Sequence, residues 1–143
     1  MRRASTGPWV PGALFGALIS LLLAGCSETP GIGDARGNVT HGGKLVTAGV
    51  VKFFPVSGGP AVAGAISPDG TYRASGVPTG RCKVAVETLE FKHMSAPPKE
   101  LAKQILVARP VYVPIPSKYE KPDSSGIEVE IKKGDNLFEL AVD

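Results

Sequence analysis

Ile127-Glu128-Val129-Glu130-Ile131-Lys132 is the stretch of this sequence that decides the fold class. Apolar and charged residues alternate along it, so the apolar side chains share one face of an extended chain and the charged ones the other. This period is typical of a β-strand with one buried face. The same alternation occurs in residues 81–89, where Cys82, Val84 and Val86 share a face. Both segments predict strands whose apolar faces line a common core.

Turn signals divide the rest of the chain into further short strands. Pro68-Asp69-Gly70 combines a residue with fixed φ, a turn former and a glycine that accepts positive φ. Lys133-Gly134-Asp135-Asn136 is expected to form the last turn in the same way. Seven strands are predicted, at residues 35–40, 49–55, 62–67, 71–75, 81–89, 127–132 and 137–142. Seven short strands joined by turns favour an all-β, antiparallel β-sandwich.

Residues 90–125 interrupt this pattern and are expected to form a Pro-rich insertion. Within it, Ser95 followed by Pro97 and Pro98 favours the start of one short helix. Four prolines then lie between Arg109 and Pro122, a spacing that excludes a helix and favours an extended strip. The apolar residues of this strip are expected to pack on the sheet: Val111, Val113 and Ile115.

The first 25 residues differ in character from the rest. Arg2 and Arg3 precede an uncharged stretch at residues 12–23, and small residues follow it. A basic start, an apolar middle and small residues before a cleavage point are typical of a secretory signal. We therefore expect residues 1–25 to be removed, 26–34 to be a flexible tether and 35–143 to be the folded domain. A retained helix is the alternative, although the run is shorter than the ~20 residues of a bilayer span.

Leu23-Ala24-Gly25-Cys26 resembles the lipobox of bacterial lipoproteins. The resemblance implies that Cys26 receives a lipid and becomes the new N-terminus, so that the membrane is one partner and the cell envelope the location. Two or more acyl chains would hold the protein stably. Because Ser27 rather than Asp follows the cysteine, the resemblance further implies the outer membrane where the host has two membranes.

Five segments of the domain resemble the carboxypeptidase regulatory-like domains: Gly37-Asn38-Val39-Thr40, Gly43-Lys44-Leu45, Val50-Val51-Lys52-Phe53-Phe54-Pro55, Asp69-Gly70-Thr71-Tyr72 and Val77-Pro78-Thr79-Gly80. The resemblance covers residues 35–88 and implies a transthyretin-like sandwich of seven strands. Cys82 stands where that family usually has Tyr. The C-terminal part, residues 115–136, resembles small lipoproteins of the planctomycete type, whose molecular function is unassigned.

Residues with catalytic chemistry are sparse. The sequence has two histidines, His41 and His93, far apart and outside any His-x-x-Glu pair. The C-terminal Leu140-Ala141-Val142-Asp143 lacks the Tyr-Arg-Gly-Ser ending of the hydrolases that share the transthyretin-like fold. We expect no enzyme, no catalytic residues, no cofactor and no metal. A surface calcium site at Asp69, Asp123 or Asp135 is the alternative, since carboxylates suit that ion.

The net charge excludes one class of partner. The chain carries +3, which falls to +1 once Arg2 and Arg3 leave with the signal, and no basic stripe interleaved with aromatic residues follows. Nucleic-acid binding is therefore not expected. Of the two cysteines, lipidation would occupy Cys26. Cys82 is then expected to be a small buried residue rather than a reactive thiol.

Two kinds of binding function remain. The first is a non-enzymatic scaffold or accessory module that contacts an envelope protein through strand edges and the Pro-rich strip. The alternative is a carbohydrate-binding module, for which Tyr112 and Tyr119 are the candidate binding surface. Both tyrosines exposed on one face would favour a glycan, whereas tyrosines packed under the insertion would favour the scaffold.

Overall fold

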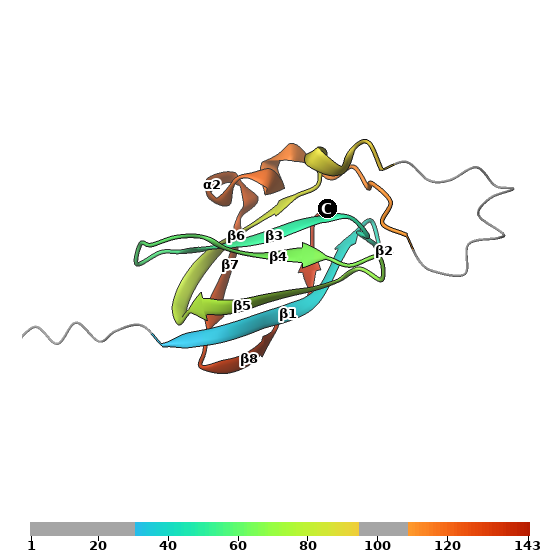
Figure 1. Ribbon diagram of the computed structural model, residues 1–143. Coiled ribbons are helices and arrows are strands. Elements are labelled where there is room, and N and C mark those ends of the chain that lie inside the picture. The colour runs from blue at the N-terminus through green and yellow to red at the C-terminus, as the bar shows by residue number, and fades with distance from the viewer. Residues whose placement is uncertain (1–30, 95–108) are drawn as a thin grey trace, which may run out of the picture.

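The computed structural model describes residues 31–94 and 109–143, which form the predicted all-β fold (Figure 1). Within these residues, three single-turn helices accompany the strands. The strands are β1 (Ile32–His41), β2 (Lys44–Leu45), β3 (Gly49–Pro55), β4 (Val62–Ile66), β5 (Thr71–Pro78), β6 (Gly80–Glu87), β7 (Ile127–Ile131), β8 (Gly134–Leu137) and β9 (Leu140–Ala141). The helices are the 3₁₀ turns η1 (Leu89–Phe91) and η2 (Ser117–Glu120), and the α-helical turn α2 (Pro122–Ser125).

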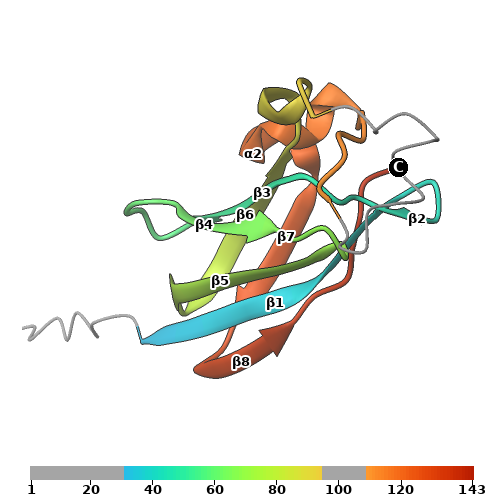
Figure 2. The ribbon, with the colours of Figure 1, turned by 45° about the vertical axis from the view of Figure 1, so that its right-hand side comes forward.

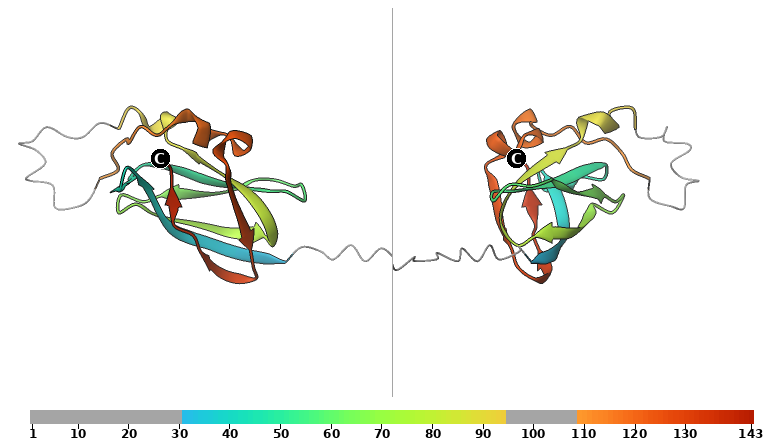
Figure 3. Two further views of the ribbon diagram at one scale, coloured as in Figure 1. Left: turned by 180° about the vertical axis from the view of Figure 1, so that it is seen from behind. Right: turned by 60° about the vertical axis from the view of Figure 1, so that its left-hand side comes forward.

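One sheet runs through the molecule in the order β2-β1-β5-β4-β3-β6-β7, and every neighbouring pair on this path is antiparallel. The sheet curls, so that β7, at one end of this path, comes close to β1 near the other end (Figures 2 and 3). β8 and β9 pair with the free side of β1. The curl therefore wraps a single interior.

The core fills the inside of the curl. Phe53 of β3 and Tyr72 of β5 meet there, with ring centroids 6.1 Å apart and planes tilted by 35°, an arrangement that aromatic pairs favour. The predicted inner face of β6 is confirmed, since Cys82, Val84 and Val86 are all buried. The alternation of β7 brings Ile131 into the same core.

β1 begins three residues earlier than the sequence analysis expected. Ile32 and Gly33 pair with Pro78 and Val77 of β5, and Gly33 also pairs with Gly134 of β8. The small, polar, Gly- and Pro-containing composition of residues 27–34 predicts a tether. Pairing on both sides of Gly33 makes Ile32–Asp34 part of the sheet, so the folded domain begins before Ala35.

The predicted turn at Lys133–Asn136 is wrong. The chain turns within two residues of β7, and Gly134–Leu137 then forms β8, parallel to β1. Asn136 fixes this turn: its Oδ1 accepts from the Lys132 amide at 2.9 Å, and its Nδ2 donates to the carbonyls of Lys132, Gly134 and Asp34 at 2.8, 3.0 and 3.1 Å. The Asn136 side chain makes the hydrogen bonds that backbone groups make in an ordinary hairpin turn. The strand that follows the turn, β8, pairs in parallel with β1.

The segment between β6 and β7 covers the outer face of β6. η2 and α2 both contact that strand, so Ala85, which the alternation placed on the solvent side, is buried. Val113 and Ile115 pack on the core as expected. The short helix expected near Pro97 lies outside the described residues.

The extended strip was predicted to continue to Pro122, but it ends at Pro116, the residue before η2. The prolines explain the difference, because Pro116 precedes η2 and Pro122 is the first residue of α2. Proline suits both positions: its φ is already near the helical value and its missing N–H is not needed there.

Candidate functional site

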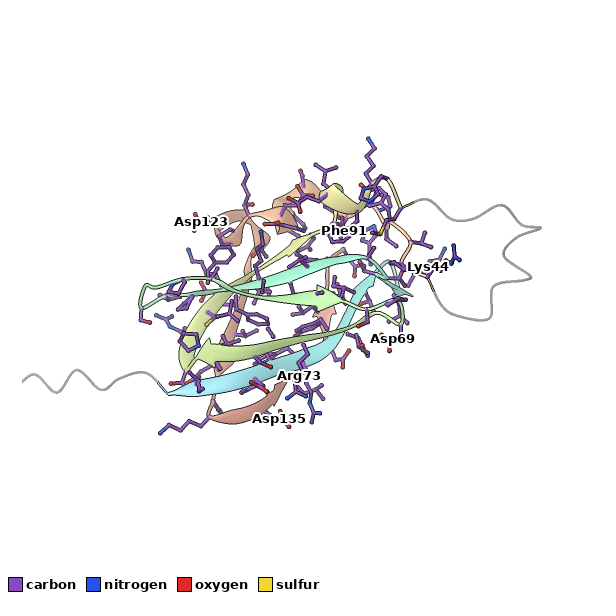
Figure 4. All side chains as sticks on the ribbon, in the orientation of Figure 1. Lys44, Asp69, Arg73, Phe91, Asp123 and Asp135 are labelled. Carbon is purple, nitrogen blue, oxygen red and sulfur yellow. The ribbon has the colours of Figure 1, made fainter. Side chains whose placement is uncertain are left out.

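Two arginines face each other across the β1–β5 pair. Arg36 and Arg73 are register partners, and their side chains are 52% and 60% exposed. Like charges placed opposite each other in a sheet are destabilising. Each guanidinium therefore has its own carboxylate: Arg73 Nη2 lies 2.7 Å from Asp34 Oδ2, and Arg36 Nη2 lies 3.4 Å from Asp135 Oδ2. The result is a cluster of two guanidinium and two carboxylate groups on the surface of the sheet, of which Figure 4 labels Arg73 and Asp135.

A shallow groove follows these arginines. Its volume is about 360 Å³, and it is lined by residues of β1 and β5, by the last residue of β8 and by one residue after it: Arg36, Gly37, Asn38, Thr71, Tyr72, Arg73, Leu137 and Glu139. We call it the arginine groove. Gly37 makes it possible, since its φ is +155° and a Cβ at this position would collide with the Phe138 carbonyl oxygen. The close approach of Phe138 brings its neighbours Leu137 and Glu139 to the groove, where they line one side.

The pKa values of two groups at the groove, Asp34 and Tyr72, are shifted by hydrogen bonding and by burial. Donation from Arg73, and then from the Gly76 amide, holds the pKa of Asp34 below its ordinary value. Burial, with a smaller contribution from the charge of Glu139, raises the pKa of Tyr72 far above its usual range. The Tyr72 hydroxyl accordingly stays protonated and donates to the Phe138 carbonyl at 3.0 Å. The groove thus offers fixed guanidinium donors and carboxylate acceptors, a set that suits hydrogen bonding to a polar ligand.

A second, smaller groove is acidic. It holds about 260 Å³ and is lined by Glu87, Leu89, Glu90, Glu120 and Lys121. Glu87 is already paired, because its Oε2 lies 2.6 Å from Lys52 Nζ. Across residues 31–94 and 109–143, no group of three His, Cys, Asp or Glu side chains is arranged to hold a metal ion.

The three aspartates considered for calcium lie in three separate places (Figure 4). Asp69 accepts from the Thr71 amide and hydroxyl at 3.0 and 2.6 Å, and this bonding lowers its pKa. Asp123 pairs with Lys83 Nζ at 2.7 Å, which lowers its pKa as well. Asp135 pairs with Arg36. The structure does not bring these carboxylates together.

The two tyrosines expected at a binding surface do not form one. Tyr119 is buried, and its hydroxyl donates to the Asp143 carbonyl at 2.7 Å, with Lys118 Nζ lying 4.6 Å from the ring centroid. Tyr112 is half-buried, and its amide donates to the Met94 carbonyl at 2.8 Å. Tyr119 is therefore a core residue that fastens η2 to the end of the chain. Its predicted role as an exposed platform is wrong.

The lipobox residues Leu23, Ala24, Gly25 and Cys26 lie outside the described residues. Among those described, no helix has the length and apolar character needed to cross a bilayer. Cys82 is buried, as expected, and burial raises the pKa of its thiol. A protonated thiol is a poor nucleophile, so the interpretation as a packing residue is supported.

Comparison with protein-family models, curated proteins and solved structures finds no match for this chain. The arginine groove was missed at the level of sequence because β1 and β5 are separated by three other strands. Alternation places Arg36 and Arg73 on the outer faces of their own strands. Only the sheet order puts them opposite each other, and no local pattern encodes that order.

Proposed function

We propose that this chain is a lipid-anchored protein of the bacterial cell envelope and that its domain is a non-enzymatic binding or scaffold module. The observation that carries the anchor is Leu23-Ala24-Gly25-Cys26 placed at the end of an uncharged run that follows two arginines. In this proposal Cys26 is acylated and residues 1–25 are removed. Ser27 after the cysteine favours the outer membrane in a host with two membranes.

The proposal includes a fold family. The seven-strand antiparallel path, with Phe53 and Tyr72 inside it, is compatible with a transthyretin-like sandwich of the carboxypeptidase regulatory-like type. The sequence motifs at residues 35–88 supply the reason to prefer that family. A fold of this kind hosts several functions, so the function must be argued from the surface.

The state of the tyrosines favours a scaffold over a glycan-binding module. Carbohydrate recognition through Tyr112 and Tyr119 needs both rings exposed on one face, whereas Tyr119, in the η2 turn of the connecting segment, is buried in the core. The outer surface instead offers the arginine groove and the margins of the curled sheet. These surfaces suit polar and main-chain contacts with a protein.

A crosslinking experiment in intact cells tests this function. The full chain is crosslinked in its native envelope and recovered beside Cys26→Ala, which removes the anchor, and the double variant Arg36→Ala/Arg73→Ala, which removes the groove cations. One envelope protein recovered with the wild type and lost in both variants supports an anchored module that binds through the groove. Recovery of the chain alone, from a membrane fraction where it is correctly localised, contradicts the scaffold function.

The glycan alternative is tested with the same variants. Binding of the wild-type chain to a glycan array, lost in Arg36→Ala/Arg73→Ala, would replace the scaffold with a carbohydrate-binding module that uses the groove. An array without signal supports the scaffold.

A further inference from the structure

The β3–β4, β5–β6 and β7–β8 connections lie at one end of the molecule, together with the start of β1 (Figure 1). Two backbone hydrogen bonds tie this end together: the Thr79 amide donates to the Gly31 carbonyl at 2.7 Å, and the Val56 amide donates to the Arg81 carbonyl at 2.9 Å. The β7–β8 turn joins them, since a Cβ on Gly31 would come within 2.6 Å of Lys133 Cε. We call the surface formed by Ile32, Val56, Arg81, Lys132 and Lys133 the anchor end.

The anchor end carries unpaired positive charge. Arg81, Lys132 and Lys133 are exposed, and within residues 31–94 and 109–143 none of them forms an ion pair. By contrast, four cations along the middle of the sheet are paired with carboxylates: Arg36, Lys52, Arg73 and Lys83.

Glu130 is the register partner of Arg81. The carboxylate of Glu130 can balance the charge of Arg81 alone, so the positive charges of Lys132 and Lys133 remain. The anchor end therefore keeps a net positive charge that no carboxylate of the described chain neutralises.

Apolar side chains lie among these cations. Ile32 is 67% exposed and Val56 is 48% exposed, and both are large hydrophobic residues at the surface. Exposed apolar residues flanked by lysine and arginine are the combination found where proteins rest on anionic membranes. The apolar groups enter the headgroup boundary while the cations meet lipid phosphates.

The position of Cys26 brings this end to the bilayer. Four residues lie between Cys26 and Gly31, and the five steps along the chain that join them span at most about 18 Å even when fully extended. The opposite end is farther away by the length of β5, whose eight residues extend over roughly 26 Å. Electrostatic attraction decays over about 8 Å at physiological ionic strength. Only the anchor end is held within reach of the lipid headgroups.

We propose that the anchor end lies against the surface of an anionic phospholipid bilayer and thereby fixes the orientation of the domain. This inference rests on the proposed lipidation of Cys26. In this orientation the β1–β2 hairpin and the β4–β5 turn point away from the membrane. The arginine groove, which runs along β1 and β5, stands beside the membrane and faces a partner in the same compartment.

Energy transfer to the bilayer tests the orientation. The full chain is purified from membranes and reconstituted into vesicles that contain an acceptor dye on the lipid headgroup. A donor dye is attached to Ser57→Cys, in the loop beside Val56, or to Ser67→Cys, in the β4–β5 turn; both serines are exposed. Cys82 is buried and does not compete for the dye. We compare vesicles of phosphatidylcholine with mixed phosphatidylcholine–phosphatidylglycerol vesicles.

On the anionic vesicles we expect transfer from the Ser57→Cys donor to exceed that from Ser67→Cys by at least about twofold, because unpaired cations hold their end at the surface. The difference should shrink on phosphatidylcholine alone, in high salt, and in Lys132→Glu/Lys133→Glu. Lys44→Glu is the matched control, since it reverses an exposed charge at the opposite end of β1.

Flotation of the same vesicles separates the two claims. A chain that does not float with the vesicles overturns both the lipid anchor and the orientation. A chain that floats but gives equal energy transfer from the two donors overturns the orientation alone. The orientation is also overturned if the difference in transfer is unchanged by the lipid charge and by Lys132→Glu/Lys133→Glu.

Discussion

Gly37 sets how closely the C-terminal part of the chain approaches β1. Its backbone has a φ of +155°, and the position of a Cβ is occupied by the Phe138 carbonyl. That carbonyl also accepts a hydrogen bond from the Tyr72 hydroxyl, and the Phe138 amide donates to the Arg36 carbonyl at 2.9 Å. A single missing side chain thus allows the segment between β8 and β9 to close over the core.

We expect Gly37→Ala to lower the free energy of unfolding by about 2–4 kcal/mol, because the added methyl group must displace backbone atoms. Gly43→Ala is the control. Gly43 has a φ of +74° but open space around it, so its substitution should cost only about 1 kcal/mol from backbone strain. Urea unfolding of the two variants makes the comparison, and equal losses would contradict the close approach at Gly37.

Asp34 makes stability depend on pH in a defined direction. Its pKa in the folded chain lies below the ordinary value of 3.8, mainly because Arg73 donates to it. A depressed pKa contributes stability that is complete above 3.8 and is lost as the pH falls through the lower, folded-state value. The stabilisation therefore belongs to the carboxylate form.

Asp34→Asn should lower the urea midpoint at neutral pH and should then lose less stability than the wild type when the pH is reduced to about 3. Glu139→Gln, which removes a carboxyl that lines the arginine groove, is the control and should follow the wild-type decline. An Asp34→Asn chain as sensitive to acid as the wild type would show that the Arg73 pair contributes nothing to the folded state.

At the scale of elements, η2 is held in place by one side chain. Tyr119 is buried in the core, and its hydroxyl bonds to the Asp143 carbonyl. The connecting segment thereby joins the outer face of β6 to the end of the chain. The covering of Ala85 depends on the same arrangement.

Tyr119→Ala should destabilise the domain by roughly 3–4 kcal/mol, the cost of removing a large buried aromatic side chain. Tyr119→Phe removes only the hydroxyl bond and should cost about 1 kcal/mol. Tyr112→Ala, at a half-buried position, is the matched control and should cost less than Tyr119→Ala. Thermal unfolding of the three variants measures this order. A Tyr119→Ala chain as stable as the wild type would return Tyr119 to the candidate binding surface.

Elements with local signals were predicted from the sequence, and elements fixed by distant partners were not. The alternation in Ile127–Ile131 reports burial on one face, so β7 was found with its inner residues. β8 carries Gly, Asp and Asn, which favour turns locally. It is a strand because β1 pairs with it and because the Asn136 side chain closes the preceding turn. Likewise, no local sequence signal distinguishes Ile32–Asp34 from a flexible tether, because these residues form a strand through pairing with β5 and β8.

In the candidate site, too, features with a local sequence signal were predicted and features that depend on distant partners were not. Cys82 was predicted to be buried because alternation alone decides its face. The Arg36–Arg73 pair was missed because it depends on strand order. Tyr119 was misassigned because its burial comes from η2, a helical turn in a segment where the prolines suggested an extended strip.

For the whole molecule, the central claim is that a lipid on Cys26 holds a binding domain at the envelope, with its cationic end toward the bilayer. All other functional statements depend on that cysteine. The direct measurement is mass spectrometry of the N-terminal peptide of the chain isolated from the membrane fraction of cells grown with a labelled fatty acid, with Cys26→Ala as the control. The account predicts a peptide that begins at acylated Cys26, lacks residues 1–25 and is absent from Cys26→Ala. An unmodified peptide that runs through Gly25-Cys26-Ser27 would contradict it.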